Sequence, residues 1–407
     1  MSAAPLRVFL GAFGDPGHAF PMLALGAELA ARGHEVTYET WTRWRADVEA
    51  AGMRFVQAPE YPVFPTRERP LRRPLGPYEA VVRATRDTRP TIAATRADVV
   101  VHDILTLAPA LAAELESVPA ATLVPHVYPV TEPGQPPYSL GARPPRTHAG
   151  AALWRAVHGS VRVGLRLGRE QLNGARRELG LPPVARLFGG LSEELVLVAT
   201  LPALEPPRQW PDHVQVVGPL MWEPESEPVT PPAGPQPLVL VAPSTSQDPE
   251  HRLLSAALAG LAREPVRLLA ATNRRPPVRP VAPAPNTRVV DWLSYRETMP
   301  SCALVICHAG HGTLVRALSS ACPVVAVPHV GDMAENAARL VWTGAGVRLP
   351  WRLLTPLTLR LAVRRALARP QLARRTAELR AWAAANPAAP RAADLVEQLA
   401  RTHHARG

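Results

Sequence analysis

The chain has 407 residues, 47% of them hydrophobic, which exceeds one ordinary domain and fits two domains of roughly 150 to 200 residues each. The net charge is +11, and all 45 cationic side chains are arginine because the sequence contains no lysine, which excludes Schiff-base and Walker-A chemistry. The arginines are scattered and form no basic stripe interleaved with aromatic residues, so we expect no nucleic-acid partner.

Strands and helices alternate along the first half of the sequence, which is the pattern of a doubly wound parallel sheet. The apolar runs that predict strands are residues 6–10, 35–40, 98–101, 121–124, 195–199 and 214–217. The predicted helices are residues 21–32, 107–115 and 151–179. Residues 129–145 are rich in Pro and Gly, and we expect a mobile loop over a pocket. We assign residues 1–220 to a first Rossmann-like domain.

The segment 221–237 combines repeated Pro with Glu and has almost no periodicity, so it predicts a linker between domains. The predicted strands beyond it are residues 238–242, 266–271, 287–290, 303–307 and 324–327, and the predicted helices are residues 250–262, 356–368, 371–385 and 392–401. The same alternation predicts a second Rossmann-like domain over residues 238–388.

The cysteines and the apolar runs bear on the cellular compartment. Cys302, Cys307 and Cys322 have the spacing of neither a zinc site nor a redox pair, so we expect buried thiols in a reducing compartment. The apolar run 8–12 is too short for the core of a signal peptide, and no apolar span of about 18 residues follows. We therefore expect a cytoplasmic protein without an integral membrane segment, either a monomer or a homodimer.

Residues 303–346 place a strand, a loop of small residues, a helix, a second strand and an acidic loop in succession. After the first of these strands, residues 308–313 can direct the free N–H groups of the next helix at a phosphate. Asp332 lies just beyond the second strand, where α/β sheets bind their ligands. An anion cradle beside a carboxylate that can bind hydroxyl groups would suit a nucleotide-linked sugar.

This stretch closely resembles the donor-binding signature of the family 1 glycosyltransferases, inverting enzymes of the GT-B fold. The matching positions are Trp292, His308, Gly310, Gly312, Thr313, Pro323, Pro328, Asp332 and Asn336. Residues 17–25 and 32–37 resemble the N-terminal segment of that family, most closely of its bacterial macrolide and polyketide members. The resemblance covers both halves. It implies an α/β fold of two Rossmann-like domains facing a central cleft, with a terminal helix over residues 389–407 crossing back to the first domain.

His18 is the candidate catalytic base. It follows the loop 14–17 and precedes a helix predicted to begin near Pro21, so its imidazole should lie at the ligand edge of the sheet. A neutral imidazole can remove the proton of an acceptor hydroxyl, and its ordinary pKa lies near working pH. His18 also matches the position of the base in the resembled family. The alternative is that this histidine only caps its loop.

Asp103 is the candidate carboxylate that orients the imidazole of His18 and stabilises its charged form. It lies at the end of the strand predicted over residues 98–101, and the resembled family carries an Asp in a similar strand-to-helix context. His102 and Asp98 are close enough in sequence to take this assignment instead. Asp103 could also serve only as a cap for the following helix.

The resemblance also supplies the remaining donor site. It implies that Trp292 stacks on the nucleobase, with Leu293 beside it, and that the Ser244-Thr245 pair contacts a phosphate. The predicted pyrophosphate cradle consists of His308, Gly310, Gly312 and Thr313, where glycine allows close approach and the helix N-terminus offsets negative charge. A lone Trp is otherwise a core residue, and a Ser-Thr pair is an ordinary helix cap. No Asp-x-Asp pair occurs, so we expect neither a metal nor a cofactor besides the nucleotide sugar.

The pair Asp332-Met333 departs from the resembled family, whose members mostly have an acidic residue followed by Gln. Methionine cannot donate the hydrogen bonds that hold a sugar hydroxyl. Either the sugar is deoxygenated, as in the thymidine-diphosphate deoxysugars, or Glu335 supplies the missing contact. His329 is a further polar candidate nearby, and the identity of the sugar stays open.

The sequence therefore predicts a metal-independent hexosyltransferase of antibiotic or other natural-product biosynthesis. It would move a sugar from UDP or dTDP to a hydroxyl or another nucleophile of a small, largely apolar acceptor. The presumed acceptor loops, residues 61–64 and 126–138, are rich in Pro, aromatic and apolar residues.

Three alternative functions share parts of this sequence pattern. A dinucleotide oxidoreductase would need a Gly-x-Gly-x-x-Gly turn, and position 315 is Val where the third Gly should stand. A nucleotide-sugar epimerase or hydrolase could use the same fold. An inactive partner protein that only binds the nucleotide sugar could share the fold as well, although such a protein would have no use for a His18–Asp103 pair.

Overall fold

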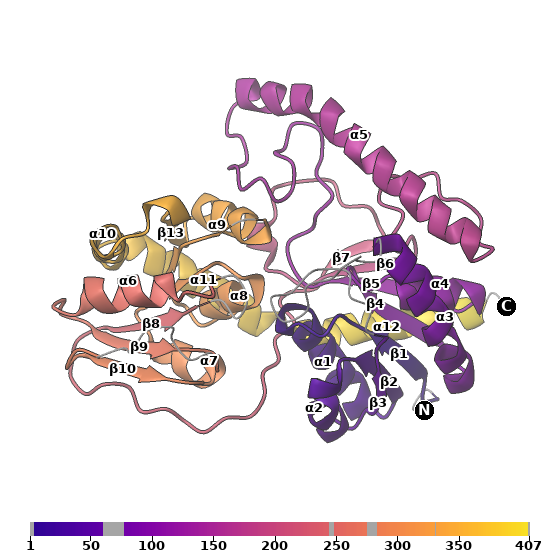
Figure 1. The fold of residues 1–407 in the computed structure, drawn as a ribbon, viewed down its shortest axis with the longest axis horizontal. Coiled ribbons are helices and arrows are strands. Elements are labelled where there is room, and N and C mark those ends of the chain that lie inside the picture. Colours follow the sequence, from indigo (N-terminus) through magenta and orange to yellow (C-terminus); the bar gives the residue numbers. More distant parts are fainter. Residues whose placement is uncertain (1–3, 60–76, 244–247, 275–282, 330, 406–407) are drawn as a thin grey trace.

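The structure is a computed structural model that describes residues 4–59, 77–243, 248–274, 283–329 and 331–405 (Figure 1). The predictions for Ser244, Thr245 and residues 61–64 lie outside the described residues. Every predicted strand is present with ends within two residues of the prediction. The α/β class and the two parallel, doubly wound sheets are confirmed.

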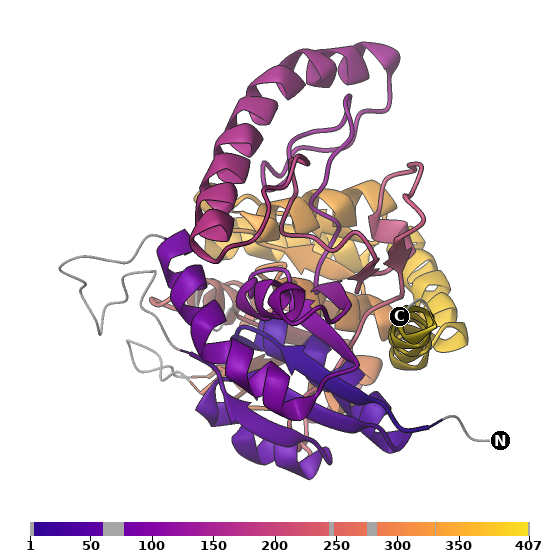
Figure 2. The same cartoon turned by 90° about the vertical axis from the view of Figure 1, so that its right-hand side faces the viewer.

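The first half forms a seven-stranded parallel sheet in the order β3-β2-β1-β4-β5-β6-β7. Its strands are β1 (Arg7–Gly11), β2 (Glu35–Thr40), β3 (Arg54–Gln57), β4 (Val99–Asp103), β5 (Ala120–Val124), β6 (Leu195–Val198) and β7 (Val214–Val216). Its helices are α1 (Pro16–Ala31), α2 (Arg45–Ala50), α3 (Pro77–Thr95), α4 (Ala108–Leu115) and α5 (His148–Glu178). In Figures 1 and 2, the long helix α5 projects away from the body.

The second half forms a six-stranded parallel sheet in the order β10-β9-β8-β11-β12-β13. Its strands are β8 (Leu238–Ala242), β9 (Arg267–Ala271), β10 (Thr287–Val290), β11 (Leu304–Cys307), β12 (Val324–Ala326) and β13 (Gly346–Arg348). Its helices are α6 (Arg252–Leu261), α7 (Tyr295–Thr298), α8 (His311–Ser319), α9 (Asp332–Thr343), α10 (Pro356–Leu367), α11 (Pro370–Ala385) and α12 (Ala388–His404). No helix in the described part of the chain is long and apolar enough to span a membrane.

Several short or polar elements were not predicted: α2, α3, α7, α9, β3 and β13. β3 has only two apolar residues in four and lies at the sheet edge. α3 is largely polar and contains Pro90, which normally argues against a helix interior. α9 begins at Asp332 in what the sequence suggested was a loop, because Gly331 adopts a positive φ of 67° that turns the chain into the helix.

The inner strands of the second sheet are buried on both faces, with an apolar cluster on each side. Leu238, Leu240 and Ala242 of β8 pack into one apolar cluster, while Val239 and Val241 pack into the cluster on the other side of the sheet. This alternation is the period of two of a strand, and burial of each Val or Leu contributes about 1.5 to 3 kcal/mol. Cys302, Cys307 and Cys322 are free, buried thiols in this half.

The two halves also share packing. α12 lies against the first half, where five of its small apolar residues join the core of the first sheet: Ala388, Ala392, Ala393, Val396 and Ala400. Arg32, the residue after α1, fixes α12 through hydrogen bonds of 2.6 Å to Asp394 and 2.9 Å to Glu397. Figure 1 shows α12, at the end of the second half, running across into the first half. Residues 217–237 join the two sheets without a helix or strand.

Glu39 is a buried carboxyl group in β2. Both of its oxygens lie near the hydroxyl of Thr88, at 2.9 and 3.0 Å. Burial, aided by the nearby negative charge of Asp87 and opposed by the hydrogen bond from Thr88, raises the pKa of Glu39 from its usual 4.5 to about 7. The folded protein therefore binds this proton more tightly than the unfolded chain does, so the associated stability is complete below about pH 4.5 and is lost as pH rises through 7.

The substitution Glu39→Gln should remove this pH dependence, because the amide keeps the shape of the side chain without titrating. Relative to the variant, the wild type should lose up to about 3 kcal/mol of unfolding free energy between pH 4.5 and 8. Urea denaturation across this range measures the difference. Parallel pH profiles for the two proteins would contradict the assignment.

Candidate functional site

His18 lies in the first turn of α1. The prediction that this helix begins near Pro21 was wrong: α1 begins at Pro16, and Asp15 precedes it in an extended conformation. Proline suits the first helical position because its φ is already helical and it needs no amide partner. Pro21 lies inside the helix, where it cannot donate to the carbonyl of Gly17. His18 is therefore held by a helix rather than by a flexible loop.

The imidazole of His18 donates from Nδ1 to Oδ1 of Asp103 at 2.8 Å. Asp103 ends β4, which pairs directly with β1, and this neighbouring of strands brings the two side chains together at one sheet edge. The side chain of Asp103 is 0% exposed and that of His18 is 18% exposed. Within the described part of the chain, Nε2 of His18 makes no hydrogen bond, so it is the ring nitrogen that can take a proton.

The two oxygens of Asp103 have different partners. While Oδ1 faces His18, Oδ2 accepts from the amide of Leu105 at 3.0 Å and lies 3.3 Å from the hydroxyl of Thr106. The carboxylate thus both turns the chain toward α4 and holds the imidazole. Asp98 lies at the other end of β4, where Arg7 donates to it at 2.7 Å, and His102 accepts from the hydroxyl of Thr122 at 2.8 Å.

Electrostatics connect His18 to the second half. Burial lowers the pKa of His18, but Asp103 more than compensates, and Asp15 and Asp332 add to the effect, so the pKa is raised overall. Asp332 is the first residue of α9 and also acts on His126 and Tyr138 of the first half. The N-terminal end of α9, at Asp332, and the ligand edge of the first sheet are therefore close in space.

His126 and Tyr138 stand beside His18 and were not singled out individually from the sequence. The ring of His126 is 6.5 Å from that of His18 and stacks on Tyr138 at 5.6 Å, with the Tyr138 hydroxyl 3.2 Å from His126 Nδ1. Burial lowers the pKa of His126, which keeps it neutral near pH 7. Its position two residues after β5 was the available signal, because that is the edge where parallel sheets bind ligands.

The cradle predicted over residues 308–313 is a helix N-terminus with open space in front of it. Gly310 precedes α8 with φ −56° and ψ 136°, values that any residue can adopt. A Cβ placed on Gly310 or Gly312 would meet no atom within 4 Å among the residues that the structure describes. The backbone does not require glycine at Gly310, and at both positions the missing side chain leaves room for a ligand. Ala309 has a left-handed φ of 63°, a strain that costs about 1 to 3 kcal/mol.

His308 is fixed by a residue that sequence reasoning missed. Its Nε2 lies 3.3 Å from Oδ2 of Asp248, and both side chains are buried. Asp248 also accepts from the amides of Arg252 and Leu253, each at 2.9 Å, at the start of α6. Burial raises the pKa of Asp248, but the hydrogen bonds from His308 and these amides outweigh it and lower the pKa. The histidine before α8 is thus anchored to the turn after β8.

His311, the first residue of α8, donates from Nε2 to the carbonyl of Ala199 in the first half at 3.3 Å. Burial lowers the pKa of His311 to about 3, so it is neutral at physiological pH. The cradle is therefore joined directly to the end of β6. No local pattern indicates this contact, which spans 112 positions.

The remaining predicted donor residues differ in their surroundings. The guanidinium of Arg274 lies 4.8 Å over the ring of Trp292, which is half-buried. Leu293 is buried in the core of the second half. Thr313 is half-buried in the first turn of α8. Within the described residues, no three His, Cys, Asp or Glu side chains are grouped to hold a metal ion.

The residues predicted to contact the sugar lie at the start of α9. Asp332 is exposed and Met333 is buried. Glu335, the candidate replacement for the missing polar contact, accepts from Nε of Arg339 at 2.8 Å and is buried. Asn336 donates to the carbonyl of Ala309 at 3.0 Å, which ties α9 to the loop before α8.

Comparisons with known proteins agree with this geometry. Residues 252–400 match the family described as Erythromycin biosynthesis protein CIII-like, C-terminal domain. The chain is 29% identical to 4'-demethylrebeccamycin synthase of Lentzea aerocolonigenes, over 97% of this chain and 99% of that protein. It is 28% identical to O-mycaminosyltylonolide 6-deoxyallosyltransferase of Streptomyces fradiae, over 98% of each chain.

Solved structures show the same fold. The glycotransferase of kitacinnamycin superposes with a TM-score of 0.76 at 21% identity, covering 98% of this chain and 100% of that one. The glycosyltransferase VinC in complex with dTDP superposes with a TM-score of 0.71 at 18% identity, covering 99% and 100%. Together, these likenesses support a family 1 glycosyltransferase of the GT-B fold, of the type found in antibiotic and other natural-product biosynthesis.

Proposed function

We propose that the protein transfers a sugar, with inversion, from UDP or dTDP to a hydroxyl or another nucleophile of a small, largely apolar natural product. The hydrogen bond between His18 and Asp103 carries this proposal, because it creates an oriented base beside Asp332 of the other half. Residues 1–220 would bind the acceptor and residues 238–388 the donor. The dTDP complex of VinC supports a nucleoside-diphosphate donor.

In the proposed step, Nε2 of His18 takes the proton of the acceptor hydroxyl as its oxygen attacks the anomeric carbon. The new carbon–oxygen bond forms on the face opposite the diphosphate, and the bond to the diphosphate oxygen breaks. The departing diphosphate keeps the electron pair, so attack and departure on opposite faces invert the configuration. Asp103 stabilises the imidazolium formed by this proton transfer, as a carboxylate does in a hydrolase dyad.

The diphosphate would lie at the N-terminus of α8. Free amides and the helix dipole there favour negative charge, and this charge increases as the bond to the sugar breaks. The open space at Gly310 and Gly312 supports close approach of an anion to the backbone. Trp292 would contact the nucleobase, although Arg274 must share or leave one face of its ring.

The sugar is proposed to be deoxygenated. Asp332 can accept from one or two hydroxyl groups, whereas the neighbouring Met333 can donate to none. Glu335 is held by Arg339, so it is poorly placed to supply the missing polar contact. An apolar position on the sugar would suit this combination.

The substitution His18→Ala should lower turnover by roughly 10²- to 10⁴-fold, the usual contribution of a general base, and leave donor affinity nearly unchanged. His148→Ala, at an exposed position on α5, is the matched control. Turnover is measured with UDP-glucose and dTDP-glucose, with and without small phenolic acceptors. Unchanged turnover in the first variant would remove His18 from the mechanism, and sugar release or epimerisation that needs no acceptor would favour a hydrolase or an epimerase.

The substitution Asp103→Asn should shift the acidic limb of the pH–rate profile to lower pH. Only the neutral imidazole acts as a base, so turnover falls as pH drops below the raised pKa of His18. Removing the negative charge lowers that pKa, while loss of the oriented tautomer reduces the maximum rate by on the order of 10²-fold. A limb that moves to higher pH would be inconsistent with this role.

The substitution Gly312→Ala should separate stability from binding. Alanine within a helix is about 0.5 to 1 kcal/mol more favourable than glycine, and the added Cβ meets no atom of the described residues within 4 Å. The same methyl group would occupy the space proposed for the diphosphate, so affinity for dTDP and UDP should fall about tenfold or more. Gly164→Ala on α5, where a Cβ also meets nothing, is the control for stabilisation without loss of affinity. Equal affinities in calorimetry would place the diphosphate elsewhere.

A further inference from the structure

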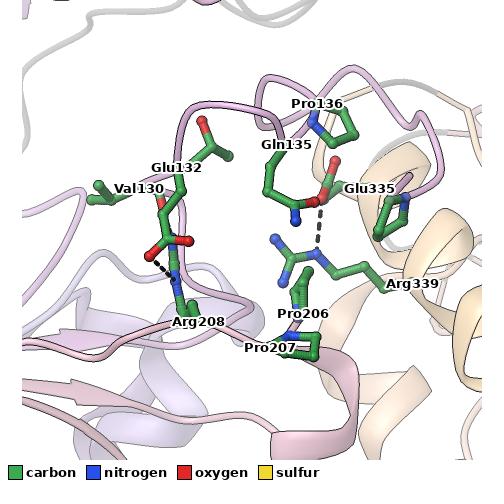
Figure 3. A pocket seen from close by; sticks show the side chains of 11 residues that line it. Val130, Glu132, Gln135, Pro136, Pro206, Pro207, Arg208, Glu335 and Arg339 are labelled. Atoms are coloured by element: carbon green, nitrogen blue, oxygen red, sulfur yellow. Dashed lines mark hydrogen bonds and ion pairs between the residues drawn. The ribbon is translucent and has the colours of Figure 1, made fainter. Parts of the chain in front are cut away.

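Arg339 of α9 links the two halves through a buried ion cluster. Its Nε donates to Glu335 at 2.8 Å within α9, and its Nη1 donates to Glu205 at 2.7 Å and to the carbonyl of Leu204 at 3.1 Å in the first half. The side chain of Arg339 is 4% exposed and that of Glu205 is 3% exposed. Figure 3 shows Arg339 and Glu335 meeting at the wall of a small cavity.

The cluster continues to the neighbours of His18. The carboxylate of Glu205 that holds Arg339 also accepts from the amide of Tyr128 at 2.7 Å. Tyr128 lies two residues beyond His126, whose ring is 6.5 Å from that of His18. At the other end, Glu335 lies one turn beyond Asp332, the residue proposed to bind the sugar. Hydrogen bonds, together with two short stretches of chain, therefore join the acceptor side to the sugar side.

Burial of these charges is costly. Two carboxylates and one guanidinium have left water, and burial raises the pKa of Glu205 despite the charge of Arg339. Apolar residues of similar volume often stabilise a fold as well as such a cluster does, so stability alone does not account for it. The planar guanidinium can hold both carboxylates in fixed directions, which a flexible apolar side chain cannot do.

A second contact joins the segment that follows Tyr128 to the second half. Arg348 of β13 donates from Nη1 to the carbonyl of Gly141 at 2.6 Å. Gly141 has a positive φ of 66°, and a Cβ there would stand 2.6 Å from the Cβ of Ala334. The segment 129–145, expected to be a loop over a pocket of the first half, is thus seated against α9 and β13.

We propose that Arg339 is a positioning residue that couples the segment 126–141 to the first turn of α9. This inference rests on the proposed function, since the segment would border the acceptor and α9 would hold the sugar. With the coupling intact, acceptor and sugar are fixed relative to each other and to His18. Without it, the donor still binds, but water competes with a poorly placed acceptor for the anomeric carbon.

Arg208 is a matched control at the same cavity (Figure 3). The cavity of about 20 Å³ holds roughly one water molecule and is bordered by both arginines. Arg208 donates to the carbonyl of Val130 at 2.6 Å, lies 3.9 Å from Glu132 and stands 5.2 Å over the ring of Tyr128. All these partners belong to the first half, so Arg208 is a comparably buried arginine that does not bridge.

Hydrogen–deuterium exchange of the nucleotide-free protein tests the coupling without any knowledge of the substrates. Arg339→Met should speed exchange about tenfold or more both in residues 332–336 and in the peptide containing Tyr128. Glu205→Gln should produce the reciprocal effect at residues 332–336 of the other half. Arg208→Met should affect the first half alone. Changes confined to the half that carries the substitution, for Arg339→Met or for Glu205→Gln, would overturn the proposal, and either variant suffices if the other does not fold.

Kinetic measurements then distinguish a positioning role of Arg339 from a purely structural one. With dTDP-glucose and a phenolic acceptor, Arg339→Met should lower the ratio of transfer to donor hydrolysis about tenfold and leave dTDP affinity within about threefold. Arg208→Met should lower that ratio much less. Equal losses in the two variants would assign Arg339 a structural role only. A wild type that shows the exchange coupling but transfers no sugar from UDP or dTDP donors, deoxygenated sugars included, would instead refute the proposed function.

Discussion

The burial of Asp103 is the constraint from which the organisation of the first half follows. A carboxylate with no exposed surface needs partners for both oxygens, and it finds them in His18 on one side and in the turn to α4 on the other. These partners are in reach only because β1 and β4 are neighbours whose carboxyl ends meet at one edge. One side chain thereby fixes the start of a connecting loop and the orientation of an imidazole.

The second half places further polar side chains beside His18. His311 contacts the end of β6, and Asp332 is close enough to raise the pKa of His18. α12 and the Arg339 cluster attach the halves at separate points, one outside the first sheet and one beside the site. A base, an anion cradle and a sugar-binding carboxylate can then act on one bound molecule. Catalysis in this arrangement depends on holding two substrates in register more than on any single reactive group.

Most of the framework could be predicted from the sequence, because buried parallel strands such as 238–242 and 304–307 are continuous apolar runs. Asp103 could be nominated because it follows a predicted strand, His18 because it follows a loop after the first strand and matches the resembled family, and the cradle because small residues precede a helix. The start of α1 was misjudged, since Pro21 was taken as the first residue when Pro16 already fills that position. α3 was missed because it is polar and contains Pro90.

The side chains that the sequence could not supply are those placed by tertiary contacts. Asp248, His311 and Arg339 have partners that lie 60, 112 and 134 residues away, and local pattern carries no information on such pairings. A crystal structure of the complex with dTDP is the most direct test of the central claim. The account predicts the diphosphate against the amides of Gly312 and Thr313, with His18 Nε2 across the sugar site, on the side opposite the leaving group. A diphosphate bound away from α8, or separated from His18 by the body of either domain, would contradict it.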